Sequence, residues 1–321
     1  MNIELICPKS KTALKRSADM LVSNEGNKYP IKNGVPRFVD EDNYSNSFGE
    51  QWNNFSATQL DSYLRKSITA DRLAKCLGSD LQDKLQGKSI LEAGCGAGRF
   101  TEVLLKQKAN VWSVDSSYAV DANVKNFHIT DSHKVFQADI LNLPFKEESF
   151  DVVICLGVIQ HTPDPEATIG MLYRQVKPGG FLVIDHYKYL LSWYLHPAPL
   201  VRFFLKRFSR RSPQGCMNLV KAMVNAMFPI HWLLWKIHPK LNWLLNRISP
   251  VITYFAAYPQ LNREQHKEWS LLDTHDSLTD WYKHRKTIKQ IKRILENLGV
   301  ENIECRYGGN GIEARGQKPP Q

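Results

Sequence analysis

The chain has 321 residues, of which 43% are hydrophobic and 23% are charged. These values are ordinary for globular proteins, so they exclude a disordered chain, a collagen-like repeat and a small disulfide-stapled domain. At roughly 150 residues per domain, the length predicts two domains or one domain with an insertion. The net charge of +10 indicates a polyanion, an anionic membrane surface or an acidic substrate as a partner.

The basic surplus belongs to one segment of the chain. No Asp or Glu occurs between Asp185 and Glu264, whereas residues 186–263 contain eleven Lys and Arg. The remaining sequence holds 31 of the 42 basic residues against all 32 acidic ones, so it is nearly neutral. The charge therefore indicates what this segment contacts and says little about the reaction.

The cysteines predict reduced thiols and a cytoplasmic protein. They form no Cys-x-x-Cys pair, and several lie in apolar runs (Cys7, Cys76, Cys95, Cys155, Cys216 and Cys305). The first 14 residues lack the apolar stretch of a signal peptide, so export is not expected. Two uncharged runs, 223–235 and 248–262, contain prolines, which argues against a spanning helix.

Residues 1–40 are predicted to form a small β-rich module. Tyr29–Pro36 has the pattern of a strand followed by a turn with Gly and Pro. Cys7 is the only cysteine in the first 75 residues, and a zinc site needs about four ligands, so no metal site is expected. The module is expected to serve packing or docking.

Five short β-branched runs alternate with helical stretches between residues 88 and 185. Such alternation predicts a parallel sheet covered by helices. A helix over 283–298 and strands over 301–307 and 311–316 are expected to follow later in the chain. The five runs are 88–91, 111–114, 134–137, 152–155 and 181–184.

A glycine-rich loop follows the first of these strands. The sequence from 89 to 100 reads SILEAGCGAGRF, with Glu92 ahead of Gly94, Gly96 and Gly98. Glycines let a backbone approach a ligand closely, and the following helix offers free N–H groups. The acid ahead of the loop suits a cationic or hydroxyl-rich ligand better than a pyrophosphate.

Acidic residues end the next two predicted strands. Asp115 closes the second strand, where a carboxylate can accept both hydroxyls of a ribose. Asp139 closes the third, where a side chain can meet an adenine amino group. Four further signatures follow in order, at 141–145, 149–155, 160–165 and 176–181.

Together these motifs resemble the class I S-adenosylmethionine-dependent methyltransferases. The resemblance implies an α/β fold with a Rossmann-like seven-stranded sheet, and S-adenosyl-L-methionine as the cofactor. It assigns the amino acid part of the cofactor to the glycine loop, the ribose to Asp115 and the adenine to the surroundings of Asp139. The implied cofactor-binding residues are Glu92, Gly94, Gly96, Gly98, Asp115, Ser116, Asp139, Ile140 and Leu156.

A Rossmann dehydrogenase is the main rival interpretation of the loop. Its motif is Gly-x-Gly-x-x-Gly, and here the third position is Arg99. The run Lys177–Gly180 also fits methyl transfer better. Residues 47–52 and 59–62 resemble a segment of a bacterial methyltransferase branch that acts on surface glycans or secondary metabolites. The N-terminal module is similar to zinc-ribbon-like modules of such proteins, but it lacks their cysteines.

The candidate catalytic residues follow the fourth and fifth predicted strands. Methyl transfer from a sulfonium is an in-line displacement that requires alignment and exclusion of water, and no metal. A base can assist a hydroxyl nucleophile, and His161, beside Gln160, and His186 are the candidates. Each can alternatively be a packing residue. Residues 272–276 either add polar groups or form a capping turn before a helix.

Residues 187–282 are predicted to form a helical insertion over the active-site edge of the sheet. Three functions are open for it: a substrate cap, peripheral contact of 187–263 with an anionic membrane, and nucleic-acid binding, which no recognised module supports. Tryptophans alternate there with basic residues, namely Trp193, Trp232, Trp235 and Trp243 with Arg202, Lys206, Arg207, Arg210, Arg211, Lys236, Lys240 and Arg247.

The expected organisation is therefore an N-terminal module (1–40), a cofactor-binding half (41–186), an insertion (187–282) and a final helix with strands (283–321). The expected function is methyl transfer to a small-molecule or lipid- or glycan-linked acceptor, with an oxygen atom as the first choice. An RNA methyltransferase and a non-catalytic cofactor-binding module are the alternatives. The expected location is the cytoplasm, with peripheral membrane contact.

Overall fold

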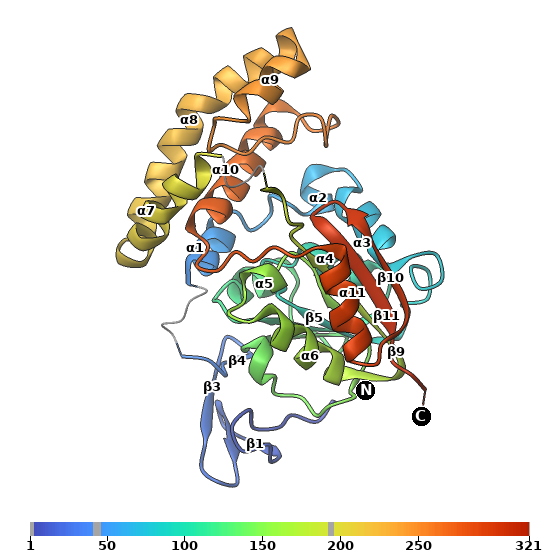
Figure 1. Ribbon diagram of the computed structural model, residues 1–321. Helices are drawn as coiled ribbons and strands as arrows, with labels where there is room; N and C mark the ends of the chain where they lie inside the picture. The colour runs from blue at the N-terminus through green and yellow to red at the C-terminus, as the bar shows by residue number, and fades with distance from the viewer. Residues whose placement is uncertain (1–2, 41–45, 192–195, 321) are drawn as a thin grey trace. The chain divides into compact units, whose positions relative to one another are not determined.

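The computed structural model describes residues 3–40, 46–191 and 196–320, and the chain divides into two compact units (Figure 1). The core unit comprises residues 1–43, 67–189 and 282–321, and the helical unit comprises residues 44–66 and 190–281. The expected division places residues 41–66 with the cofactor-binding half, whereas residues 44–66 cluster with the insertion in the structure. Each unit is assembled from segments that are distant in sequence.

Seven strands form the main sheet of the core unit, in the order β10-β11-β9-β8-β5-β6-β7. The last two strands of the chain complete it, because β11 (Gly311–Gln317) runs antiparallel to β9 and β10 (Glu301–Gly308) runs antiparallel to β11. The arrangement confirms the predicted Rossmann-like α/β fold. The parallel strands are β5 (Ser89–Ala93), β6 (Asn110–Asp115), β7 (His133–Gln137), β8 (Phe150–Cys155) and β9 (Val176–His186).

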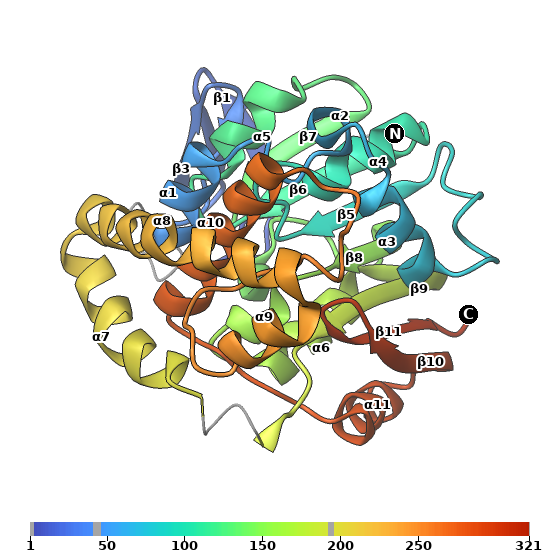
Figure 2. The same cartoon turned by 90° about the horizontal axis from the view of Figure 1, so that it is seen from above.

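Helices bury both faces of this sheet (Figure 2). Successive strand residues point to opposite sides, so Ile90 packs with α3 and α4 while its neighbour Leu91 packs in the core that contains α6 and α11. Burial on both sides explains why the strands are continuous apolar runs. The elements are α3 (Ile68–Leu77), α4 (Arg99–Lys106), α5 (Val120–Asn126), η1 (Ile140–Asn142), η2 (Ile159–His161), α6 (Pro165–Gln175) and α11 (Ile288–Asn297).

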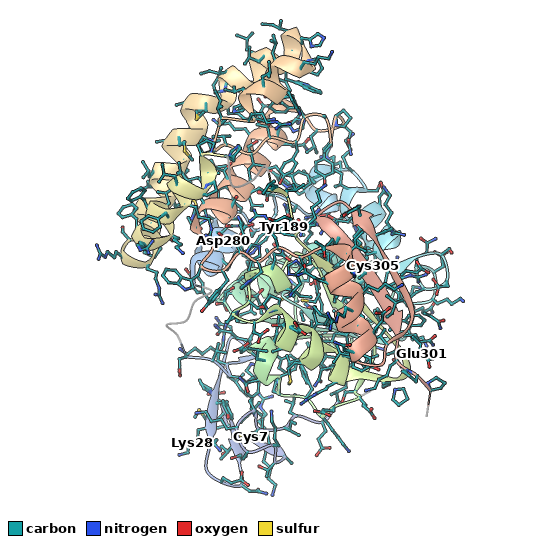
Figure 3. The ribbon with its side chains drawn as sticks, viewed as in Figure 1. Cys7, Lys28, Tyr189, Asp280, Glu301 and Cys305 are labelled. Atoms are coloured by element: carbon teal, nitrogen blue, oxygen red, sulfur yellow. The ribbon has the colours of Figure 1, made fainter. Side chains whose placement is uncertain are left out.

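The N-terminal module is a four-stranded antiparallel sheet of β1 (Leu14–Ser17), β2 (Met20–Ser23), β3 (Lys28–Lys32) and β4 (Val35–Pro36). Its small core contains Cys7 and Tyr29, with the Cys7 sulfur 3.2 Å from the tyrosine hydroxyl, while Lys28 is exposed (Figure 3). Across the described ranges, no group of three or more His, Cys, Asp or Glu side chains is placed to hold a metal ion. The Cys7 side chain is fully buried in the core of the module.

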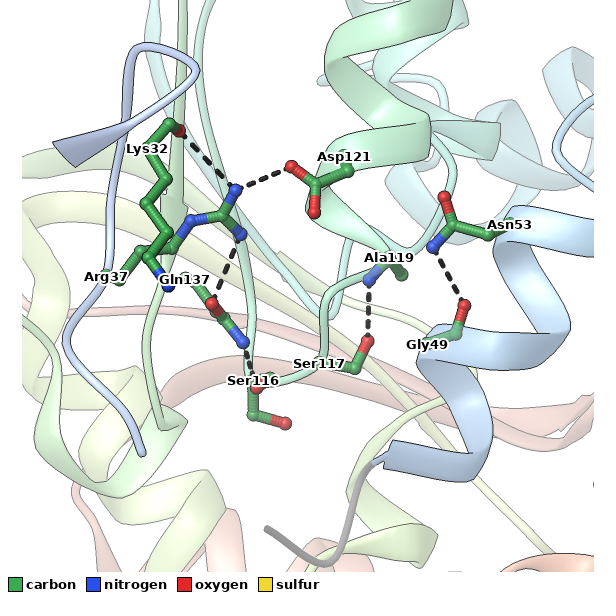
Figure 4. A network of polar contacts seen from close by, with 9 residues as sticks. All are labelled: Lys32, Arg37, Gly49, Asn53, Ser116, Ser117, Ala119, Asp121 and Gln137. Atoms are coloured by element: carbon green, nitrogen blue, oxygen red, sulfur yellow. Dashed lines mark hydrogen bonds and ion pairs between the residues drawn. The ribbon is translucent and has the colours of Figure 1, made fainter. Parts of the chain in front are cut away.

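A buried arginine attaches this module to the edge of the main sheet. Arg37 donates to Gln137 Oε1 of β7 at 3.1 Å and to Asp121 Oδ1 of α5 at 2.5 Å (Figure 4). The Gln137 amide in turn donates to the carbonyl oxygen of Ser116 at 3.1 Å. The N–H of Phe38 donates to the Gln137 carbonyl at 2.7 Å. The module thus covers the edge of β7 and orients the loop that follows β6.

The helical unit packs around one long helix. Val220, Val224 and Phe228 of α8 are fully buried in its core, and Arg202 pairs with the buried Asp280 at 2.6 Å. The helices are α1 (Asn46–Asn54), α2 (Asp61–Leu64), α7 (Ala198–Arg211), α8 (Pro213–Ile237), α9 (Pro239–Leu245) and α10 (Arg263–Thr279).

The structure differs from the sequence prediction at residues 272–276. These residues lie inside α10, so the prediction of a capping turn there is wrong, and Asn262 caps the helix instead. Trp193 lies outside the described residues. None of the described helices combines the length and the apolar character that a membrane span needs.

Replacing Arg37 with Ala should destabilise the core unit, because Gln137 and Asp121 lose a donor in a mostly buried contact. We expect a loss of about 1–3 kcal/mol in urea unfolding. Arg16→Ala, on the exposed part of β1, should change stability by less than about 0.5 kcal/mol. Equal unfolding midpoints for the two variants would contradict the attachment role of Arg37.

Candidate functional site

The loop between β5 and α4 adopts a conformation that requires glycine. Gly94, Gly96 and Gly98 have φ angles of 80°, 50° and 99°, in the left-handed region that other residues rarely adopt. A Cβ atom on Gly94 would lie 2.1 Å from the Val158 side chain, and one on Gly98 would lie 2.6 Å from the Phe127 ring. Backbone geometry and lack of space therefore both explain the glycine motif.

Asp115, the last residue of β6, connects this loop to the second strand. Its Oδ2 accepts a hydrogen bond from the N–H of Gly96 at 2.9 Å, and its Oδ1 accepts from the N–H and hydroxyl of Ser117 at 2.8 and 2.7 Å. Burial raises the pKa of this carboxyl above its usual value. A carboxylate oxygen offers two lone pairs, so Oδ2 can also accept a hydrogen bond from a ligand hydroxyl.

The carboxylate of Glu92 forms its hydrogen bonds inside the fold. It accepts from the N–H of Thr101 at 3.0 Å, from the Thr101 hydroxyl at 2.5 Å and from the Ser113 hydroxyl at 3.0 Å. Burial raises the pKa of Glu92 to about 7. Because Thr101 lies in the first turn of α4, these contacts hold the start of the helix against β5 and β6. Glu92 thereby supports the glycine loop from within.

The other residues implied by the resemblance lie at the ends of neighbouring strands. Asp139 follows β7 and caps η1, with Oδ1 accepting from the N–H of Leu141 at 3.0 Å. Ile140 and Leu156 are buried, and Leu156 directly follows β8. Ser116 directly follows β6. Since these strands are parallel, the residues share the carboxyl edge of the sheet, where open α/β sheets bind ligands.

A buried ion pair, which the sequence does not single out, holds the loop after β8. Asp185, near the end of β9, pairs with Arg72 of α3, and its Oδ1 accepts from the N–H of Gly157 at 2.6 Å. Burial raises the pKa of Asp185, although Arg72 opposes that shift. The Arg72 guanidinium also lies 5.5 Å from the ring centre of Phe100 in α4. The pair therefore connects α3, β9 and the loop after β8.

The two candidate bases are both buried near the ends of β8 and β9. His161 ends η2, its ring centre lies 5.3 Å from that of Tyr187, and its Nδ1 lies 3.2 Å from the carbonyl oxygen of Tyr282. His186 is the last residue of β9 and is 1% exposed. Burial lowers the pKa of His186 to about 4, so its imidazole is neutral at physiological pH.

The hydrogen bonding of His186 defines its tautomer. Nδ1 lies 2.9 Å from the carbonyl oxygen of Tyr187, which can only accept, so Nδ1 carries the proton. Nε2 then presents a lone pair. It is buried and has no hydrogen-bond partner among the described residues.

Further buried polar atoms without a partner in the described structure accompany His186. They are both side-chain amide atoms of Gln160 and Nε2 of His284. His284 belongs to a segment that lies against η2 and the end of β9, because its N–H donates to the Gln160 carbonyl at 2.9 Å and the N–H of Lys286 donates to the Tyr187 carbonyl at 3.0 Å. Buried polar groups are nearly always paired, so this cluster is suited to a polar ligand or water.

The sequence contains no signal for His284. It lies 98 residues after His186 along the chain, in a polar stretch without helical or strand periodicity. Only the return of the chain past β9 brings it to Gln160.

Comparison with known proteins identifies the family. Residues 91–184 match a family model described as a methyltransferase domain. Two ubiquinone biosynthesis O-methyltransferases, from Pseudomonas entomophila (strain L48) and Pseudomonas putida (strain W619), are 33% and 31% identical to this chain. Each match covers 45% of this chain and 68% of the relative. The chain belongs to the class I S-adenosylmethionine-dependent methyltransferases, and its cofactor is S-adenosyl-L-methionine.

Solved structures of lower identity are also similar to the chain. Magnesium protoporphyrin IX methyltransferase from Synechocystis PCC 6803 is 15% identical with a TM-score of 0.44, over 86% of this chain and 96% of that one. Human N-acetylserotonin methyltransferase is 14% identical with a TM-score of 0.45, over 85% of this chain and 56% of that one.

Gly94→Ala should strongly weaken cofactor binding, because the added methyl group requires a left-handed alanine and meets Val158. Backbone strain alone predicts about a 10- to 100-fold loss of affinity for S-adenosylhomocysteine by titration calorimetry. Gly170→Ala in α6 is the matched control, since its methyl group would meet only Leu298 at 3.8 Å. Wild-type affinity in Gly94→Ala would show that the loop conformation is not needed.

Wild-type stability should decline relative to Glu92→Gln as the pH rises from 4.5 to about 7. The folded carboxyl keeps its proton over this interval and the unfolded one does not, so its contribution is complete below pH 4.5 and is lost as the pH passes 7. The difference in unfolding free energy should change by about 2–4 kcal/mol. Urea unfolding of both proteins across the interval measures it, and parallel pH profiles would contradict the raised pKa.

Proposed function

We propose that the protein methylates an oxygen atom of a small-molecule or lipid-linked acceptor. The Pseudomonas relatives are named as O-methyltransferases, which supports oxygen as the acceptor atom. The observation that carries the proposal is the buried lone pair of His186 Nε2 at the carboxyl end of β9. A neutral imidazole in this position can accept the proton of a hydroxyl group.

We propose that the residues at the ends of the parallel strands bind the cofactor. The loop of Gly94, Gly96 and Gly98 would hold the amino acid part, and Asp115 with Ser116 the ribose. Asp139, Ile140 and Leu156 would surround the adenine. The lone pair left on Asp115 Oδ2 supports the ribose contact, and the apolar side chains of Ile140 and Leu156 suit a flat ring. Glu92 would act by supporting the loop.

The bound cofactor supplies a methyl group that is already activated on a sulfonium sulfur. The residues of the chain then have to align the acceptor, exclude water and take a proton. His186 serves as the proposed base, and the Gln160 amide offers a donor and an acceptor to orient the acceptor molecule. His161 is the second candidate base, with Nδ1 directed to the Tyr282 carbonyl.

The low pKa of His186 restricts the acceptor chemistry. Burial lowers the pKa of His186 and makes it a weak base, so a comparatively acidic hydroxyl suits it best as a proton donor. Phenols, with a pKa near that of tyrosine at about 10, are therefore favoured over aliphatic alcohols.

We also propose that residues 187–263 make peripheral contact with an anionic membrane. The absence of acidic residues from this stretch and its eleven Lys and Arg support an anionic partner. Large apolar side chains exposed in the same stretch favour a lipid surface over a nucleic acid.

Exchanging His186 for Asn should lower kcat for a phenolic acceptor by about 100-fold or more, because the base is lost. Binding of S-adenosylhomocysteine should stay unchanged. Transfer of labelled methyl groups to a panel of phenols measures turnover, with His128→Asn, an exposed histidine, as the control.

The pH profile provides an independent readout of the same residue. The wild-type kcat/KM should fall as the pH approaches 4, because His186 becomes protonated there. Titration of His186 should cause no change in kcat/KM near pH 6.5, the pKa of an ordinary histidine. Near-normal turnover of His186→Asn would remove His186 as the base and leave His161 to be tested in the same way.

A further inference from the structure

The outward side of α7 is apolar. Its exposed residues recur at spacings of three and four, so they lie along one side of the helix. The opposite side, which includes Ala198 and Leu205, is buried in the core of the helical unit. The exposed residues are Leu200, Phe203, Phe204 and Phe208, at 65%, 50%, 62% and 40% exposure.

The outward sides of α8 and α9 continue this pattern. In α8, Leu219, Ile230, Leu233 and Ile237 are each more than half exposed and lie on the side opposite Val224. In α9 and just after it, Leu241, Trp243, Leu244 and Ile248 are exposed. Monomeric proteins rarely expose so many large apolar side chains on consecutive helices unless the helices bind a partner.

Basic side chains lie among these apolar ones. The Arg207 guanidinium lies 4.0 Å from the ring centre of Phe203, and the Arg247 guanidinium lies 4.3 Å from that of Trp243. Arg211, Lys236 and Lys240 are also exposed. No acidic residue occurs anywhere between 186 and 263. Long cationic side chains can lie along apolar surface while their charged ends reach outward.

We infer that these outward faces of α7, α8 and α9, three helices labelled in Figure 1, bind an anionic lipid bilayer, and we call them the docking surface. Only one side of α7 and α8 is available, because their other sides form the core of the helical unit. The helices would therefore lie in the plane of the membrane interface. The apolar side chains would enter the boundary of the acyl chains, with Arg and Lys at the level of the phosphates.

A second copy of the chain fits this surface less well. In a symmetric dimer the same patch meets itself, so the cations of one docking surface would face those of the other without any carboxylate from this stretch. A nucleic acid would satisfy the cations and leave the leucine and isoleucine side chains in water. An anionic bilayer satisfies both groups of side chains.

The structure changes which residues of the insertion carry this contact. Trp232 and Trp235 pack against the core of the helical unit, and Arg202 is committed to Asp280. Lys206 is partly buried and lies over the Trp281 ring, 5.0 Å from its centre. Phenylalanine and aliphatic side chains, with Trp243, form the apolar part instead.

Flotation with vesicles tests the docking surface on the full chain. We expect wild-type protein to float with phosphatidylcholine vesicles that contain about 30% phosphatidylglycerol, and much less with phosphatidylcholine alone. A charge variant (Arg207→Gln, Arg211→Gln, Lys236→Gln and Lys240→Gln) should lower vesicle partitioning by about 100-fold or more at low salt, since each cation near the surface contributes roughly fivefold. An apolar variant (Phe204→Ser, Leu233→Ser and Ile237→Ser) should also lose flotation.

Matched controls separate this effect from general changes in charge or folding. Lys9→Gln, Lys84→Gln, Lys108→Gln and Lys125→Gln remove the same charge from exposed positions of the core unit, and Tyr307→Ser removes an exposed ring from β10. Both controls should float like the wild type. S-adenosylhomocysteine binding and a thermal melt verify that every variant is folded.

Three results would overturn the inference. The first is a wild-type protein that does not float with anionic vesicles, and the second is flotation that does not depend on the docking-surface residues. The third is a wild-type protein that does not bind vesicles but is a dimer by light scattering, while the apolar variant is a monomer. The inference deepens the membrane contact proposed above. Because turnover of a soluble phenol is measured without vesicles, failure of the proposed methyl transfer and failure of the docking surface can be told apart.

Discussion

Burial of the main sheet on both faces is the constraint on which the rest of the core unit depends. Helices cover both sides, so the strands carry apolar side chains in both directions. Polar chemistry is then concentrated where strands end, because loops there leave the apolar layers. Asp115, Asp139 and His186 all lie at or just beyond the carboxyl ends of strands. The site is therefore a consequence of how the sheet is packed.

Buried carboxylates stabilise the loops that form this edge. Glu92 anchors the start of α4 beneath the glycine loop, and Asp185 anchors the loop after β8 through Gly157. Asp115 bonds to Gly96 in the loop itself. Burying an acid is costly unless donors surround it, and each of these carboxylates accepts at least one backbone N–H. Ordered loops limit the rearrangement needed when a ligand binds.

The fold and the glycine loop could be predicted from the sequence because local patterns define them. Apolar runs mark the buried strands, and the positions of Gly94 and Gly98 reflect a left-handed backbone that other residues rarely adopt. Arg72 and His284 could not be predicted, since each acquires its role from a neighbour that is distant along the chain. From the sequence, the tryptophans of the insertion are the candidates for an apolar membrane contact. Exposure depends on packing, and the exposed apolar residues are instead Phe203 and its neighbours.

Because the helical unit is built from two separate segments of the sequence, recombination between related proteins is restricted. Gln51 of α1 and His275 of α10 are both buried and bond at 2.9 Å across 224 residues of sequence. A single contiguous cut at the borders of 190–281 would remove the partners of α1 and leave its buried polar groups unmatched. Transfer of this unit between methyltransferases by recombination therefore requires two segments to be exchanged together. One precedes the cofactor-binding strands in the sequence and the other follows them. A newly made chain likewise cannot complete the unit until the ribosome has passed residue 281.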